Sequence, residues 1–228
     1  MISEQAEYFK KNHYVIIKNF VPKDMCTVLY YHILLAAQRL DYITQNKTHY
    51  NKEDLPLPNP DENIIKDIFG TFEDTQAMGD YSKYGEPIFD AMCGASLEKM
   101  QEHTGLQLTP TYTYHRLYTT GTELERHIDR ESCEISTTIC IGYNTSNLED
   151  KNWNWPMYIK PKNDDEIPVY MEPGDMVIYR GCELEHWREP FIGLNHAQVF
   201  MHYNEKNGEY DIQNDGRAFL GLPQSFRE

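Results

Sequence analysis

The second half of the chain is a succession of short segments rich in β-branched and aromatic residues, and this pattern restricts the fold more than any other feature. Gly, Pro, Asn and Asp separate the segments, as turns separate short strands. The expected strands cover 107–118, 135–143, 157–160, 169–171, 175–179 and 197–203. Short strands in this arrangement predict a β-sandwich or a β-barrel.

The first half has helical periodicity instead. A short strand is expected at 14–18, and apolar residues then keep helical spacing over about 23–40. A second amphipathic helix is expected over about 86–104, with Gly105 where a C-terminal cap would stand. The polar, proline-bearing stretch from about 44 to 60 predicts a loop. Helices first and strands later indicate an α+β fold that is mainly β.

The length of 228 residues fits a single domain, 1–228, with enough chain to bury a sizeable core. Within it, we expect residues 1–105 to form a supporting region of strand and helices. Residues 106–228 would form most of the β-rich core.

The charge balance limits the partners that the chain can have. The sequence has 36 acidic and 21 basic residues, a formal net charge of −15, which repels phosphate backbones and anionic lipids. We therefore expect neither a nucleic acid nor a membrane partner, although a local basic pocket for a small dianion is compatible with this charge. The five cysteines form no CxxC pair, and the first residues lack the apolar stretch of a signal peptide. These features predict a reducing, cytoplasmic compartment.

Three residues form the strongest candidate site, namely His127, Asp129 and His186. On an extended segment, two residues separated by one position point to the same face, so His127 and Asp129 would lie together. Two imidazoles and one carboxylate are the ligand set of non-haem Fe(II) oxygenases, which leaves coordination positions open. A histidine and an aspartate at this spacing are common by chance. The alternative to a metal site is therefore an exposed His127–Asp129 pair at the end of a strand.

The residues around this candidate site carry a family resemblance. They read Y-x-x-G-x-x-x-x-x-H-x-D from Tyr118 to Asp129, then a strand at 138–143, a Pro-Gly-Asp turn at 173–175, and H-x-x-x-P from His186. The chain resembles the 2-oxoglutarate- and Fe(II)-dependent dioxygenase superfamily, and within it the prolyl 4-hydroxylase-like group. The resemblance covers most of the chain. It implies a double-stranded β-helix (jelly-roll, cupin-like) core with N-terminal supporting helices, and Fe(II) bound by the three candidate residues.

The sequence departs from that group at the residue that binds the distal carboxylate of 2-oxoglutarate. The group has a Lys or Arg on the last core strand about ten residues after the distal histidine, where this chain has His196. Three replacements are physically reasonable: His196 if protonated, Gln198 on the same strand face, or Arg188, which alternation places on the same side as His186. We favour Arg188, since a guanidinium offers two parallel hydrogen bonds to a carboxylate.

Two tyrosines, Tyr118 and Tyr143, match positions where the family presents a phenol to the cosubstrate carboxylates. A plain core role is the alternative for each, because the chain has 17 Tyr.

The resemblance implies an enzyme, a hydroxylase that couples oxidative decarboxylation of 2-oxoglutarate to succinate with hydroxylation of a C–H bond. Dioxygen would be consumed, and ascorbate is a further cofactor that the resemblance suggests. The expected substrate is a prolyl or other protein or peptide side chain, or a small molecule. One alternative is a catalytically inactive jelly roll that acts as a metal-binding or interaction module. A second alternative is a structural β-sandwich with a coincidental triad. The sequence does not specify the substrate, the type of oxidation or the oligomeric state.

Other reactive residues have competing interpretations. Arg130 would make either a substrate contact or a surface ion pair. Trp153 and Trp155 would either close over a substrate or cap the end of a barrel. Cys133 and Cys140 are expected to be buried thiols. No GxxxxGK[ST], GxSxG or GxGxxG motif is present, which argues against nucleotide-binding and serine-hydrolase functions.

Overall fold

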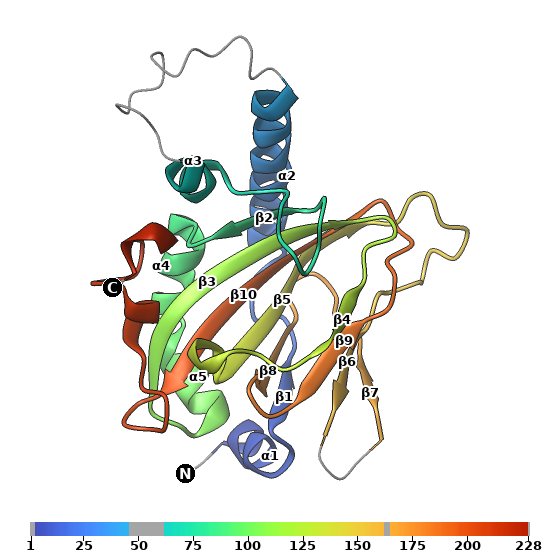
Figure 1. The fold of residues 1–228 in the computed structure, drawn as a ribbon. Helices are drawn as coiled ribbons and strands as arrows, with labels where there is room; N and C mark the ends of the chain where they lie inside the picture. The colour runs from blue at the N-terminus through green and yellow to red at the C-terminus, as the bar shows by residue number, and fades with distance from the viewer. Residues whose placement is uncertain (1–2, 46–61, 162–164, 228) are drawn as a thin grey trace.

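The larger of two antiparallel sheets forms the centre of the molecule. A computed structural model describes residues 3–45, 62–161 and 165–227 (Figure 1). The larger sheet has six strands in the order β1-β8-β5-β10-β3-β2. These strands are β1 (Tyr14–Ile17), β2 (Tyr81–Tyr84), β3 (Leu108–Thr119), β5 (Ile135–Asn144), β8 (Met176–Arg180) and β10 (Asn195–Glu205).

The smaller sheet has four strands in the order β4-β9-β6-β7. They are β4 (Leu124–His127), β6 (Met157–Lys160), β7 (Ile167–Val169) and β9 (Glu185–Arg188). From β3 onward the chain passes repeatedly from one sheet to the other, since β3, β5, β8 and β10 belong to the larger sheet and the strands between them to the smaller one. The fold is therefore β-rich and antiparallel, as the sequence predicts.

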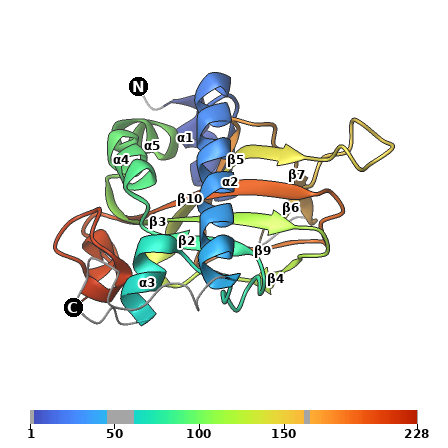
Figure 2. The ribbon, with the colours of Figure 1, turned by 90° about the horizontal axis from the view of Figure 1, so that it is seen from above.

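The helices pack on one face of the larger sheet (Figure 2). They are α1 (Glu4–Asn12), α2 (Lys23–Gln45), α3 (Glu62–Phe69), α4 (Pro87–Ala95) and α5 (Leu97–Thr104). The buried residues of α2 recur every three or four positions: Cys26, Leu29, Ile33, Ala36, Ala37 and Leu40. This spacing places one side of the helix on the sheet. In the described part of the chain, none of the helices combines the length and apolar character that a membrane-spanning segment needs.

Alternation along the strands of the larger sheet determines which side chains face the space between the sheets. On β5, Ile135 and Ile139 belong to the core under the helices, whereas Ser136 and Thr138 point the opposite way. On β10 the same alternation turns three residues away from that core: Gln198, Phe200 and His202. Both faces of these strands are buried, so polar residues on the second face lie inside the protein.

Several boundaries differ from those that the sequence predicts. The expected helix at 86–104 is two helices, α4 and α5, which meet at Ser96. Gly94, a weak helix former, lies just before the break. Gly105 does end the second helix, with a left-handed φ of 73°. Of the loop expected over about 44–60, residues 44 and 45 are helical instead, because α2 continues to Gln45, and the rest of that stretch lies outside the described residues.

Candidate metal centre

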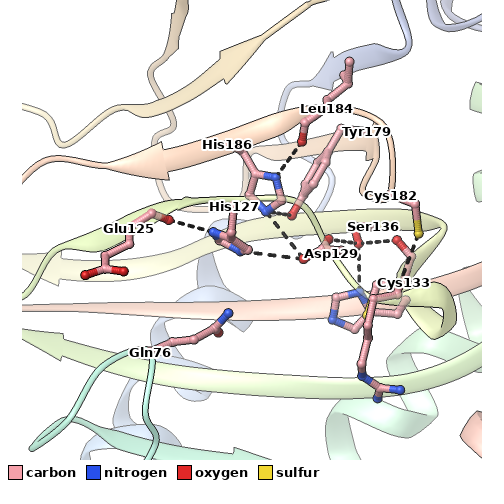
Figure 3. Close-up of polar contacts among 12 residues, drawn as sticks. Gln76, Glu125, His127, Asp129, Cys133, Ser136, Tyr179, Cys182, Leu184 and His186 are labelled. Atoms are coloured by element: carbon pink, nitrogen blue, oxygen red, sulfur yellow. Dashed lines mark hydrogen bonds and ion pairs between the residues drawn. The ribbon is translucent and has the colours of Figure 1, made fainter.

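The three candidate residues meet at the end of the smaller sheet. His127 is the last residue of β4 and lies directly opposite His186 of β9 in the strand register. Their ring centres are 4.3 Å apart. Asp129 lies just past β4, where its backbone N–H donates to the carbonyl of Gly181 at 2.9 Å. One donor atom from each of the three residues lies within 4.8 Å of the others (Figure 3).

Hydrogen bonds to the backbone orient both imidazoles. His127 Nδ1 lies 2.7 Å from the carbonyl oxygen of Glu125, and His186 Nδ1 lies 2.9 Å from that of Leu184 (Figure 3). A carbonyl only accepts hydrogen bonds, so each Nδ1 carries the proton. Each Nε2 therefore has a lone pair, and these two atoms lie 3.8 and 3.5 Å from Asp129 Oδ1. His186 Nε2 also lies 3.4 Å from the hydroxyl of Tyr179. A metal-binding histidine is held in this way by its other ring nitrogen.

The local electrostatics favour a charged Asp129 and a neutral His127, but they raise the pKa of His186. Burial by itself would raise the pKa of Asp129, but the nearby His186 and a hydrogen bond from Ser136 outweigh it, so the pKa lies well below the ordinary range. Burial, and then the neighbouring His186, lower the pKa of His127. An ionised carboxylate and a neutral imidazole bind divalent metals without first losing a proton. Burial tends to lower the pKa of His186, but the neighbouring Asp129 carboxylate outweighs it and raises the pKa, so a metal would have to displace a proton from a protonated His186.

A cavity of about 610 Å³ opens beside these residues, between the two sheets. The smaller sheet contributes His127, His186 and Arg188 to its wall, and the larger sheet contributes Tyr118, Thr138, Tyr179, Gln198 and His202. A segment of 70–76 lines the opposite side. The volume is in the range of small-molecule sites.

Arg188 is a buried cation with no carboxylate partner among the described residues. Its Nη1 donates to the carbonyl of Trp155 at 2.9 Å, and the guanidinium lies 4.5 Å from the Trp155 ring centre. Its Nη2 has no hydrogen-bond partner in the described part of the protein. Burial lowers the pKa of Arg188 to about 10. A desolvated, unpaired charge is unfavourable, so an anion bound in the cavity would supply the missing interactions.

The structure brings three of the five candidates for the cosubstrate site to the cavity and leaves two outside its wall. Arg188, Tyr118 and Gln198 line the cavity. His196 does not, because it is surrounded by the rings of Tyr143, Trp155 and Phe191. Tyr143 stacks on His196 and donates its hydroxyl to Glu172 at 2.8 Å, near the surface.

Polar side chains without partners accompany Arg188 in the cavity wall. Neither amide atom of Gln198 has a hydrogen-bond partner in the described residues, nor does the Thr138 hydroxyl. Tyr118 differs, since its hydroxyl accepts a hydrogen bond from Arg116 Nη1 at 3.2 Å. The Tyr118 hydroxyl proton is therefore directed to another acceptor.

Two ion pairs at the cavity were not predicted as such from the sequence. Arg116 pairs with Asp74 inside the cavity, which connects β3 to the segment opposite. Arg130 makes a bidentate pair with Asp215, at 2.7 and 2.9 Å, so the ion-pair interpretation of Arg130 fits the structure. The aspartates lie far from their partners along the chain, and no local pattern indicates such pairs.

The buried residues noted in the sequence have packing roles. Trp155 is 3% exposed, packs against Tyr118 and donates its N–H to the Glu189 carbonyl at 2.7 Å. Cys133 and Cys140 are buried, and burial raises the pKa of each thiol. The expectation of buried thiols is therefore confirmed.

Solved structures with a similar fold are 2-oxoglutarate/Fe(II) oxygenases. A prolyl-4-hydroxylase from Pseudomonas putida superposes with a TM-score of 0.59 at 16% identity, over 90% of this chain and 99% of that chain. A prolyl hydroxylase from Trichoplax adhaerens, solved with a peptide fragment of hypoxia inducible factor, gives 0.56 at 13% identity, over 89% and 88%. An oxidoreductase of the 2OG-Fe(II) oxygenase family from Burkholderia pseudomallei gives 0.54 at 11% identity, over 93% and 97%.

The chain thus shares the fold of 2-oxoglutarate/Fe(II) oxygenases that include prolyl 4-hydroxylases, and the resemblance inferred from the sequence is confirmed at that level. No protein-family profile matches the chain. No curated protein matches it either.

Proposed function

We propose that the protein is a 2-oxoglutarate- and Fe(II)-dependent oxygenase in which His127, Asp129 and His186 bind the iron. The observation that carries the proposal is that two imidazole Nε2 atoms and the Asp129 carboxylate meet in the same cavity as Arg188, a buried arginine with no carboxylate partner among the described residues. The triad suits a divalent metal with open coordination positions. The arginine suits a carboxylate. A structural β-sandwich has no need of either feature.

The proposed fold type is the double-stranded β-helix. Its support is the repeated passage of the chain between two antiparallel sheets from β3 to β10, with the triad between them. We propose a single oxygenase domain, in which 1–105 supplies the supporting helices with β1 and β2, and 106–228 supplies most of the β-helix.

For the cosubstrate we propose that Arg188 binds the distal carboxylate of 2-oxoglutarate. Tyr118 would donate its hydroxyl proton to the same carboxylate, since that oxygen already accepts from Arg116. The Gln198 amide and the Thr138 hydroxyl offer further hydrogen bonds from the larger sheet. His196 and Tyr143 are not part of this proposal.

When bound, Fe(II) would supply the redox chemistry that couples decarboxylation of 2-oxoglutarate to succinate with oxidation of a C–H bond by dioxygen. The chain itself holds the ligands in place and keeps Asp129 ionised. A protein or peptide side chain is the proposed substrate, because two of the similar structures are prolyl hydroxylases and one of these was solved with a peptide.

An anaerobic titration tests the proposal. Fe(II) and then 2-oxoglutarate are added to purified protein while the visible metal-to-ligand charge-transfer band is recorded. The band should form in the wild type, be lost in His127→Ala, and persist in the control His13→Ala, which removes a histidine paired with Glu183 away from the cavity. Absence of the band in the wild type would refute the cosubstrate assignment and favour a metal-binding or interaction module.

A further inference from the structure

A short chain of hydrogen bonds lies behind Asp129, on the side away from the two histidines. Ser136 Oγ lies 2.6 Å from Asp129 Oδ2 (Figure 3). It also lies 3.0 Å from His202 Nδ1. Ser136 and His202 come from adjacent strands, β5 and β10, which pair at these two residues. The larger sheet therefore contacts the metal-binding carboxylate that the smaller sheet presents.

The direction of these hydrogen bonds follows from the number of protons available. The Ser136 hydroxyl has one proton, and its shortest contact is with the ionised Asp129, which can only accept. The hydroxyl oxygen must then accept from His202, so His202 carries its proton on Nδ1. The carbonyl of Cys133, at 3.0 Å, competes for the same hydroxyl proton but lacks a negative charge.

The surroundings hold this chain in one arrangement. Ser136 is 0% exposed and His202 is 6% exposed. The Tyr112 ring stacks on the His202 imidazole with centres 4.5 Å apart. On the other side, a Cβ at Gly181 would lie 2.3 Å from Asp129 Oδ2 and 2.7 Å from Ser136 Oγ, so only glycine leaves room for the carboxylate.

We propose that Ser136, oriented by His202, is a positioning residue that restrains Asp129 to present a single oxygen to the metal. Oδ2 is occupied by the hydroxyl, and Oδ1 is the atom that faces both histidines, at 3.5 and 3.8 Å. A carboxylate fixed in this way gives one ligand atom and leaves the remaining positions for cosubstrate and dioxygen. This inference rests on the proposed iron site.

The test uses Co(II), an air-stable probe for the same ligands, with the full chain. Binding is followed by the d–d absorption of Co(II), and the thermal unfolding of each metal-free variant is measured in parallel. Ser136→Ala removes the hydroxyl, and His202→Leu removes the donor behind it, whereas His202→Gln keeps an N–H. The matched control is Thr111→Val, which removes another buried hydroxyl, one that donates to the Ser132 carbonyl at 2.7 Å.

We expect Ser136→Ala and His202→Leu to bind Co(II) about 10- to 100-fold more weakly than the wild type, while His202→Gln recovers part of the affinity. The d–d band should also change in Ser136→Ala, because the released Oδ2 becomes a possible second ligand atom. Thr111→Val should bind Co(II) as the wild type does. A merely structural role would lower the unfolding temperature without moving the affinity or the band.

Two results are distinguishable failures. If the wild type fails to bind Co(II), the metal site itself is wrong, and with it the proposed function. If the wild type binds Co(II), and folded Ser136→Ala and His202→Leu bind it with the same affinity and spectrum, the positioning role is overturned while the metal site stands.

Discussion

Replacing Arg188 by methionine should stabilise the ligand-free protein while removing its response to 2-oxoglutarate. The guanidinium is fully buried, has no carboxylate partner in the described residues and leaves Nη2 without a hydrogen bond. A methionine of similar length would fill much of the same volume without a charge. The substitution separates the cost of the charge from the size of the side chain.

The magnitude follows from the pKa of this group. Burial lowers the pKa of Arg188 to about 10 from the ordinary 12.5. At neutral pH the guanidinium is charged in both the folded and the unfolded chain, so the full pKa difference lowers the stability of the folded state. Each pKa unit corresponds to about 1.4 kcal/mol, which gives a cost of about 3 kcal/mol. Losing the hydrogen bond to the Trp155 carbonyl offsets about 1 kcal/mol or more. The expected gain is about 1–2 kcal/mol, or about 2–8 °C in the unfolding midpoint for a chain of this size.

The assay is thermal unfolding of metal-loaded protein with and without 2-oxoglutarate. At 100 times its dissociation constant, a ligand that binds only the folded state adds about 2.7 kcal/mol, which the wild type should show and Arg188→Met should lack. The control is Arg116→Met, another buried arginine that is fully paired, with Asp74 and Tyr118. Breaking that pair should destabilise the protein by about 3–5 kcal/mol.

The prediction is that Arg188→Met raises and Arg116→Met lowers the stability of the ligand-free protein. If Arg188→Met destabilises the ligand-free protein as much as Arg116→Met does, Arg188 is a structural residue. If Arg188→Met keeps the full response to 2-oxoglutarate, the carboxylate is bound elsewhere.

Three further outcomes are expected. Gly181→Ala should weaken Co(II) binding about tenfold or more. The added Cβ would lie 2.3 Å from Asp129 Oδ2 and 2.4 Å from the backbone carbonyl oxygen of Cys133, which cannot easily move. Unchanged binding would contradict this packing argument. Burial tends to raise the pKa of Asp215, but hydrogen bonds led by Arg130 outweigh it and lower the pKa, so Asp215→Asn should cost about 1–3 kcal/mol at pH 7. The deficit in urea unfolding should shrink as the pH falls below about 4, because the carboxylate then takes up a proton in the unfolded chain before it does so in the folded protein; a constant deficit would argue against the ion pair. Ile139→Ala, at a fully buried site under the helices, should cost about 2–5 kcal/mol in urea unfolding and leave Co(II) affinity intact; a change in affinity would show that the core and the metal site are coupled.

Sequence reasoning predicts the parts of this protein that local patterns encode. The expected strand at 197–203 is such a pattern, and alternation along it places Gln198 on a strand face that lines the cavity in the structure. The apolar spacing of α2 is another. The candidate triad is predicted because two of its members lie two residues apart and the third lies in an H-x-x-x-P pattern after a Pro-Gly-Asp turn, and the three side chains do meet.

Other features depend on distant chain segments and have no local signal. The strands β4 and β9 have four residues each and contain charged side chains, so they lack an alternating apolar pattern. The partner of Arg116 comes from a segment before β2, and the partner of Arg130 comes from the C-terminal region. His196 matches the family position of the anchor in the sequence, but aromatic side chains from other segments enclose it. Only the folded arrangement shows that Arg188 and Gln198 line the cavity and that His196 does not.

Arg188 and His186 lie on the same strand, β9, so the geometry of that strand fixes the distance between their side chains. Two residues along a strand span about 6–7 Å, and both side chains leave from the same face. Hydrogen bonds to β4 on one side and β6 on the other hold that strand at a fixed extension. If a metal held by His186 binds one end of the cosubstrate and Arg188 binds the other, the accepted length of a 2-oxo dicarboxylic acid is set by backbone geometry. A 2-oxo dicarboxylic acid longer by one methylene group would then have to bind in a bent conformation. Selectivity for the length of the acid would therefore come from the residue spacing of a β-strand and would not depend on the surrounding loops.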